Sequence, residues 1–165
     1  MDNEAGFVEL FRREHPGLVR ELTLILGDRL LAEDVGADAF AELWRKWSAV
    51  GSYDRPGAWV RRVALRNAGR ARWRRHRRVS VEASFIGSRS ADSLDLDLVT
   101  SLAQLSEAQR IALVMHHLGG WPAAEIAVVI GCAEVTVRTH LHRGRHRLAE
   151  LLRDTTPLEV NDGES

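Results

Sequence analysis

The sequence has a single cysteine, Cys132, and a single lysine, Lys46, and it lacks any long apolar run. One cysteine cannot form an internal disulfide, which fits a reducing compartment. No apolar segment approaches the roughly 20 residues of a membrane span, and the chain shows no basic-then-apolar leader. We therefore expect a cytoplasmic protein without membrane insertion.

The sequence also lacks the alternation of apolar and polar residues that is typical of a half-buried strand. Apolar residues recur instead at helical spacing, and Gly and Pro separate the helical stretches. Pro16 is expected to interrupt or bend the first stretch. The pattern predicts an all-α fold, with helices at about residues 7–26, 30–47, 56–78, 94–105, 106–118, 122–130 and 134–153.

Residues 79–93 carry five serines and weak periodicity, which predicts a flexible linker. We therefore expect two small helical domains, residues 1–78 and 94–153, joined by this linker. Residues 154–165 are acidic and rich in turn-forming residues, which predicts a disordered tail.

The formal net charge is zero, but the charges are segregated along the chain. Residues 1–54 hold eleven acidic and six basic side chains, whereas residues 55–78 hold ten arginines and no acid. Codon usage could explain why 22 of the 23 basic residues are arginine. Arginine is nevertheless well suited to phosphate and to guanine edges, because its planar fork binds both in two-point fashion.

Phosphate binding alone requires no aromatic side chain, yet Trp59 and Trp73 lie within the arginine-rich stretch. Unpaired bases stack on such rings, and an asparagine such as Asn67 can donate to and accept from a base edge. A core position is an equally open interpretation for Trp59 and the favoured one for Trp47. No role is assigned to Trp73.

Residues 122–153 have the pattern of a helix-turn-helix: a short apolar helix, Gly131 at a turn, and a second helix with a basic face. The outer face of the second helix carries Arg138, Thr139, His142 and Arg143, which suit base edges and phosphates. An ordinary helical hairpin with a solvated basic face is the alternative.

The histidines raise the possibility of a metal-dependent hydrolase. His140, His142 and His146 lie close together in the sequence, and His116 and His117 are adjacent. No nearby carboxylate or cysteine completes a ligand set on the helix face that carries the first three, and Leu118 stands where an aspartate would be needed. We therefore expect no metal, no cofactor and no catalytic activity.

Three segments together resemble an extracytoplasmic-function (ECF) sigma factor of bacterial RNA polymerase. They are "AEDVGADAFAELWRKW", "YDRPGAWVRRVALRNAGRARWRR" and "LAQLSEAQRIALVMHHLGGWPAAEIAVVIGCAEVTVRTHLHRGRHRL". The resemblance covers about residues 5–152. It implies a sigma region 2 bundle and a sigma region 4 helix-turn-helix. It also implies that the protein directs core polymerase to promoters and helps to open the −10 element.

The resemblance also implies site residues. For the flipped base and backbone of the −10 non-template strand they are Trp59, Arg61, Arg62, Arg66, Asn67 and Arg70. For the −35 duplex they are Arg138, Thr139, His142 and Arg143. For the clamp coiled coil of the polymerase β′ subunit they are Asp34 and Asp38, with Phe40 and Trp44 as support.

The family implies two further partners, the β flap of polymerase for region 4 and an anti-sigma factor. Gly144 departs from the alanine common in the family, and we expect it to weaken the last helix by about 1 kcal/mol. The alternative function is a helix-turn-helix regulator that binds only duplex DNA.

Overall fold

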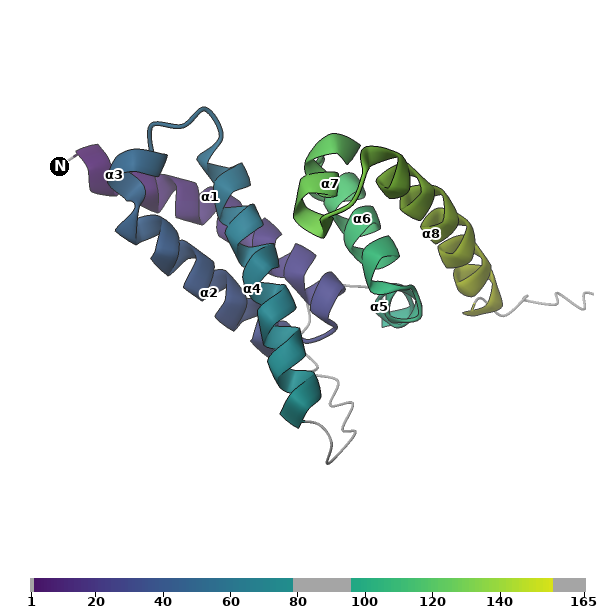
Figure 1. Ribbon diagram of the computed structural model, residues 1–165. Helices are drawn as coiled ribbons and strands as arrows, with labels where there is room; N and C mark the ends of the chain where they lie inside the picture. Colours follow the sequence, from purple (N-terminus) through teal and green to yellow (C-terminus); the bar gives the residue numbers. More distant parts are fainter. Residues whose placement is uncertain (1, 79–95, 156–165) are drawn as a thin grey trace, which may run out of the picture.

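The computed structural model describes residues 2–78 and 96–155, and these residues form eight helices and no strand (Figure 1). The predicted all-α fold is confirmed. The predicted linker, residues 79–93, and all but the first two residues of the predicted tail lie outside the described residues. Within the described residues, no helix combines the length and the apolar character that crossing a bilayer requires.

The first four helices form one group in Figure 1. They are α1 (Asp2–Leu26), α2 (Arg29–Arg45), α3 (Trp47–Val50) and α4 (Pro56–Arg78). The helix α1 continues through Pro16, so the proline does not interrupt it. A short helix, α3, forms where the sequence predicted only a loop after residue 47.

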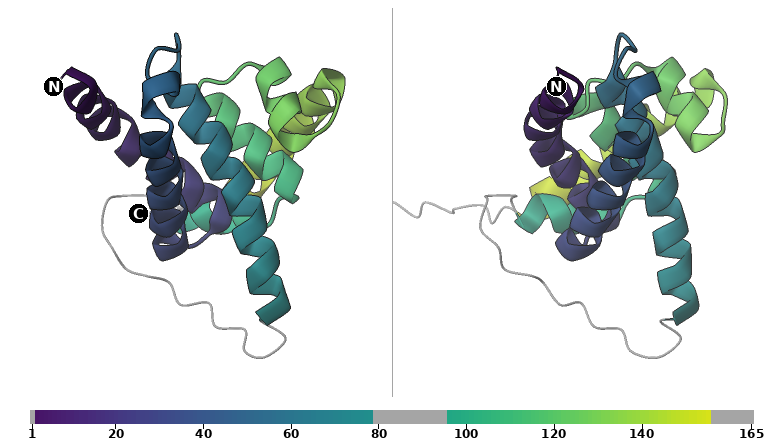
Figure 2. Two further views of the ribbon diagram at one scale, coloured as in Figure 1. Left: turned by 60° about the vertical axis from the view of Figure 1, so that its left-hand side comes forward. Right: turned by 90° about the vertical axis from the view of Figure 1, so that its left-hand side faces the viewer.

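The core of this group is built from the apolar stripes of α1, α2 and α4. Its fully buried members include Leu18 and Leu22 of α1, Leu43 of α2 and Val60 of α4. Trp47 is buried at the edge of this cluster, as predicted, and Trp59 packs against it while partly exposed. The C-terminal half of α4 projects away from the other helices (Figure 2).

The second group contains α5 (Leu96–Ala103), α6 (Glu107–His117), α7 (Ala123–Ile130) and α8 (Glu134–Thr155). Its core includes Met115 and Val114 of α6, Ile126 of α7 and Val137 of α8. The last helix continues through Thr155, two residues beyond its predicted end.

Local signals in the sequence account for several helix ends. Asp28 caps α2, because its Oδ1 accepts a hydrogen bond from the Leu31 amide at 3.0 Å. Ser106 and Gln109 form the predicted capping box at the start of α6. Gly131 ends α7 at φ 77°, a left-handed conformation that glycine adopts without strain.

Gly144 has a packing role that the sequence did not reveal. It is buried where α8 crosses α6, and a β-carbon added there would lie 3.1 Å from Leu113 Cδ1. The absence of a side chain therefore lets the two helices approach closely. Glycine lowers the helix propensity of α8 at this position, and the close approach of the two helices explains why a glycine stands there.

The two groups are not independent bodies, because the end of α1 contributes to the second core. Leu24 and Ile25 are 2% and 3% exposed and belong to the cluster formed with α5, α6, α7 and α8. Leu65 of α4 packs against both clusters. The second group is thus seated on the C-terminal turns of α1.

Candidate nucleic-acid interface

The arginines of α4 divide between two sides of the helix. Arg62, Arg66 and Arg70 are spaced four residues apart, and all three are exposed. Because an α-helix turns by about 100° per residue, Trp59 lies on the same side as these arginines, Asn67 lies beside this side next to Arg70, and Arg61 lies on the other side. We name Arg62, Arg66 and Arg70 the basic strip.

Trp59, at the N-terminal end of the basic strip, and Asn67, at its edge, are only partly exposed. The Nζ of Lys46 lies 5.6 Å from the centroid of the Trp59 ring, within the range of a cation–π contact. One face of the indole is thus oriented by the only lysine in the sequence. Trp59 packs against the core of the first group and remains partly exposed, so the fold holds its ring beside the strip.

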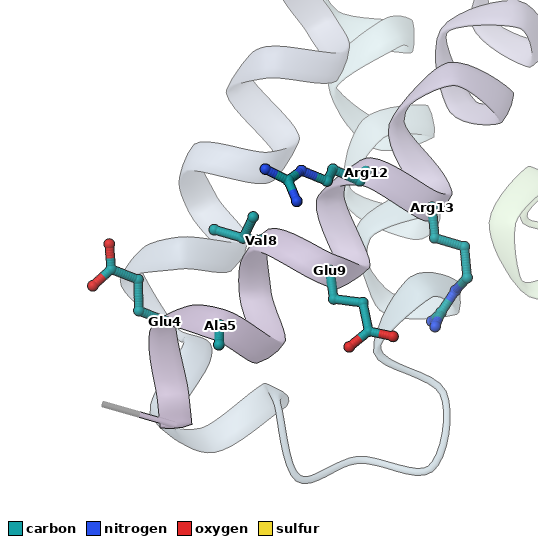
Figure 3. Close-up of a pocket in the computed structure, with 6 residues that line it drawn as sticks. All are labelled: Glu4, Ala5, Val8, Glu9, Arg12 and Arg13. Carbon is teal, nitrogen blue, oxygen red and sulfur yellow. The ribbon is translucent and has the colours of Figure 1, made fainter.

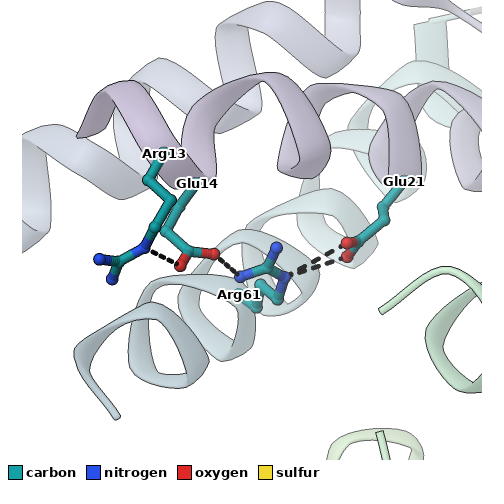
Figure 4. A network of polar contacts seen from close by, with 4 residues as sticks. All are labelled: Arg13, Glu14, Glu21 and Arg61. Carbon is teal, nitrogen blue, oxygen red and sulfur yellow. Dashed lines mark hydrogen bonds and ion pairs between the residues drawn. The ribbon is translucent and has the colours of Figure 1, made fainter. Parts of the chain in front are cut away.

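Arg61 points into the molecule (Figure 4). Its Nη1 donates to Glu14 Oε2 at 2.5 Å, and its Nε lies 3.3 Å from both carboxylate oxygens of Glu21. The Arg61 side chain is 15% exposed. It ties α4 to α1, and it is not exposed on the face that carries the basic strip. We therefore remove it from the candidate DNA contacts.

The pKa values of this network reflect burial and pairing. Burial opposes ionisation of Glu14, but the hydrogen bonds and charges of Arg61 and Arg13 outweigh it and lower its pKa. Glu21 is more deeply buried, and burial raises its pKa despite Arg61. Gly57 leaves room for the network, because a β-carbon there would lie 3.0 Å from Glu14 Cδ.

The acidic face of α2 is partly used within the fold. Glu42 accepts a hydrogen bond from Arg66 of the basic strip at 3.3 Å and lies 3.6 Å from Lys46. Asp34 and Asp38 are exposed one helical turn apart, and neither forms an ion pair with another described residue. These two carboxylates therefore remain available to a basic partner.

Phe40 and Trp44 have different environments on α2. Phe40 is 2% exposed and packs edge-on against Phe11, with ring centroids 4.8 Å apart. Trp44 is 49% exposed and rests on Phe7, with ring centroids also 4.8 Å apart. Trp44 can thus contact a partner directly, whereas Phe40 acts only by supporting the helix from below.

The predicted helix-turn-helix corresponds to α7, the turn at Gly131, and α8. Val137 and Leu141 of α8 are buried, which turns Arg138, His142 and Arg143 outward. Arg138 Nη2 donates to Glu134 Oε1 at 2.7 Å, and Thr139 Oγ1 donates to the Val135 carbonyl at 3.0 Å. The outward face of α8 is therefore basic, and these two hydrogen bonds are formed within the helix.

Val135 is a candidate contact that the sequence reasoning missed. It is 70% exposed in the first turn of α8, on the same face as Arg138 and Thr139. An exposed valine there can contact the methyl group of thymine in a major groove. The signal available in the sequence was its position three residues before Arg138 and four before Thr139, which places all three on one face of a helix.

The histidines have structural environments. His116 Nδ1 lies 2.9 Å from the Trp121 carbonyl, so it fixes the turn after α6. His142 and His146 pack edge to face, with centroids 4.5 Å apart. Within residues 2–78 and 96–155, no three His, Cys, Asp or Glu side chains are grouped to hold a metal ion.

The surface of α1 near its start offers no enclosed site. The depression in Figure 3 is lined by six residues of this single helix: Glu4, Ala5, Val8, Glu9, Arg12 and Arg13. It is shallow and open and carries charges of both signs, unlike the concave, mostly apolar sites that hold cofactors.

Comparison with known proteins points to one family. Residues 10–79 match the family described as Sigma-70 region 2, and residues 95–148 match Sigma-70, region 4. The ECF RNA polymerase sigma factor SigL of Mycobacterium tuberculosis is 31% identical over 151 residues, which cover 84% of this chain and 85% of SigL.

Two further similarities concern length and structure. The probable ECF RNA polymerase sigma factor SigI of Mycobacterium tuberculosis is 30% identical over 155 residues, but this chain spans only 53% of its length. The sigma factor RpoE of Bartonella quintana, solved with the anti-sigma factor NepR, superposes with a TM-score of 0.74 at 26% identity. That match covers 91% of this chain and 98% of RpoE.

Proposed function

Since this chain belongs to the ECF sigma factors, we propose that it binds core RNA polymerase, directs it to specific promoters and helps to open the −10 element. One observation carries the proposal. A single chain presents a basic strip flanked by Trp59 and Asn67 on α4, and a second basic face on a helix-turn-helix. A regulator that binds only duplex DNA needs the basic face of the helix-turn-helix but not the basic strip with Trp59 and Asn67.

The basic strip would bind the phosphate backbone of the −10 region. Each phosphate that Arg62, Arg66 or Arg70 neutralises releases counterions and adds a salt-dependent increment to affinity. Trp59 would stack on a base extruded from the non-template strand, and Asn67 would read its edge. Lys46 supports this role, because its ammonium group contacts one face of the indole.

The outward face of α8 would read the −35 element in the major groove. Arg143 and His142 supply donors for guanine O6 and N7, and Val135 supplies an apolar contact for a thymine methyl. Glu134 holds the Arg138 guanidinium along the helix in the free protein. On DNA, this arginine would exchange that carboxylate for a phosphate or a base edge.

The exposed side of α2 would dock on the clamp coiled coil of the β′ subunit. Asp34 and Asp38 supply negative charge that no other described residue pairs with, and the half-exposed ring of Trp44 supplies an apolar anchor farther along the helix. The second helical group would dock on the β flap. We place the protein in the cytoplasm, because polymerase and DNA are its proposed partners.

An anti-sigma factor is a further proposed partner. RpoE of Bartonella quintana, whose similarity covers 91% of this chain, was solved in complex with one. We propose no catalytic role and no cofactor, because polymerase supplies the chemistry of transcription.

Reconstituted transcription tests the proposal. The protein is mixed with bacterial core polymerase and genomic DNA fragments, and the transcripts are mapped. We expect initiation at a discrete set of sites, and we expect its loss in the double variant Asp34→Asn, Asp38→Asn. Binding to duplex DNA without initiation would instead favour the helix-turn-helix regulator. Full initiation by the double variant would contradict the proposed docking face.

A further inference from the structure

A groove of about 350 Å³ opens on the second helical group, where α5, α6 and α8 lie beside the end of α1. Its walls include Leu24 of α1, Leu102 of α5, Val114 of α6 and Leu148 of α8. All of its lining residues are apolar except one histidine and one arginine. We name this hollow the apolar groove. Its composition is that of a small-molecule site, which is mostly apolar and carries a few polar groups.

Helical spacing explains why the walls of the groove are apolar. Leu98 and Leu102 lie four residues apart on α5. Leu148 and Leu152 have the same spacing on α8. Residues four apart share one face of a helix, so each helix turns an apolar face toward the same hollow. Ala149 contributes only a methyl group on the α8 side, and it leaves space that a larger side chain would fill.

The two polar residues of the lining both favour an anion. Arg145 of α8 is exposed and forms no ion pair with another described residue. His117 at the end of α6 is also exposed, and its ring centroid lies 5.0 Å from that of His116. Among the described residues that line the groove there is no acidic side chain. The rim of the groove therefore offers positive charge that no carboxylate of the lining neutralises.

The pKa of His117 reflects this excess of positive charge. Partial burial lowers the pKa, and the charges of His116 and Arg145 lower it further. A bound anion would relieve the repulsion between the protonated imidazole and Arg145. The apolar walls in turn favour a group that removes their surface from water. The groove thus suits a molecule with one negative end and one apolar end.

We propose that the apolar groove binds a medium-chain fatty acid, with its carboxylate at Arg145 and His117 and its alkyl chain between α5, α6 and α8. The planar guanidinium of Arg145 can donate to both carboxylate oxygens. The groove volume lies at the lower end of the range of small-molecule sites, about 300–1,000 Å³. It therefore suits a single alkyl chain better than the two chains of a phospholipid.

Isothermal titration calorimetry of the full chain with decanoate tests the proposal. The ligand is kept below the concentration at which it forms micelles, and we expect one binding site. Decyltrimethylammonium has the same alkyl chain but the opposite charge, and we expect it to bind at least about 5-fold more weakly. The titration needs neither polymerase nor DNA, so its outcome is independent of the proposed function.

Three variants separate the contribution of charge from that of the apolar walls. Arg145→Met is expected to weaken decanoate binding by about 3- to 10-fold and not to weaken binding of decyltrimethylammonium. The matched control is Arg147→Met on the opposite side of α8, where Arg147 pairs with Glu150 at 3.2 Å, and we expect no change. Leu118 lines the groove and is already 42% exposed, so Leu118→Gln leaves the core intact. It should weaken both amphiphiles.

Several results would overturn the proposal. Absence of decanoate binding would do so directly. Equal affinity for decanoate and decyltrimethylammonium would indicate an apolar face without a charge preference, as a helix of a partner protein would use. Equal effects of Arg145→Met and Arg147→Met would remove the carboxylate from the rim. A dimer in sedimentation that Leu118→Gln dissociates would assign the groove to a second copy of the chain.

Discussion

The two basic helices, α4 and α8, neutralise their arginines in different ways. On α4, Arg61, Arg62 and Arg66 pair with carboxylates of α1, α7 and α2. On α8, Arg138 and Arg147 pair with glutamates of α8 itself. Charge on α4 is therefore part of the tertiary structure, whereas charge on α8 is a local surface property. The two helices should respond differently to the same substitution.

Removal of an arginine gives the largest expected difference. Arg61→Met leaves the buried Glu21 without its cation and leaves Glu14 with only the exposed Arg13, and we expect the free energy of unfolding to fall by about 3 kcal/mol. Arg147→Met breaks only an exposed pair on α8, for which about 0.5 kcal/mol or less is expected. Urea unfolding of both variants measures the difference, and equal losses would show that the Arg61 network is not structural.

Promoter recognition by α8 gives the next largest effect. Arg143→Ala is expected to weaken use of the −35 element by about 1 to 3 kcal/mol, the usual scale of a base contact. Run-off transcription on promoters with and without a −35 element measures this. Arg153→Ala, an exposed substitution in the last turn of the same helix, is the control. A loss of equal size on both promoters would refute the assignment.

Asn67→Ala on α4 tests the proposed recognition of the −10 element. We expect weaker discrimination at one −10 position by about 1 to 3 kcal/mol, because the amide matches one base edge. Arg70→Ala should instead weaken binding to all −10 sequences and reduce the salt dependence. Competition among a panel of −10 variants distinguishes the two, and an unchanged preference profile in Asn67→Ala would remove Asn67 from the base pocket.

A pair of glycine substitutions contrasts the packing of the two helices. Gly144→Ala on α8 forces Leu113 to move, and overpacking of this kind costs about 1 to 2 kcal/mol. Gly69→Ala on α4 meets no atom within 4 Å, so the gain in helix propensity should stabilise by about 1 kcal/mol. Thermal unfolding measures both, and stabilisation by Gly144→Ala would show that α6 and α8 adjust without strain.

The smallest effect concerns pH. The lowered pKa of Glu14 stabilises the fold above its ordinary value of 4.5, and this contribution is lost as the pH falls through the folded-state pKa. The raised pKa of Glu21 acts in the opposite sense, because its protonation on acidification favours the folded state.

Glu14→Gln should therefore lower the free energy of unfolding at neutral pH, with a deficit that shrinks on acidification. Relative to the unsubstituted chain, Glu21→Gln should become less favourable as the pH falls. Denaturant unfolding on both sides of pH 4.5 measures these slopes. Parallel slopes in the two variants would contradict the opposite pKa shifts.

The sequence was most informative where a residue acts on its own segment. The capping pair Ser106 and Gln109, the turn at Gly131 and the outward face of α8 were all predicted and found. Their interactions span a few residues, so spacing alone specifies them. The pairing of Arg61 with α1 was not predicted, because its partners there are 40 and 47 residues away.

The sequence by itself determined the helices, the concentration of arginine in α4 and the basic face of α8, because helix periodicity and capping are local properties. Only the tertiary structure decided that Arg61 is buried, that Gly144 lets α6 and α8 approach, and that Glu125 pairs with Arg55 and Arg62. Each of these depends on how helices that are distant along the chain pack together, and helical spacing does not encode that geometry.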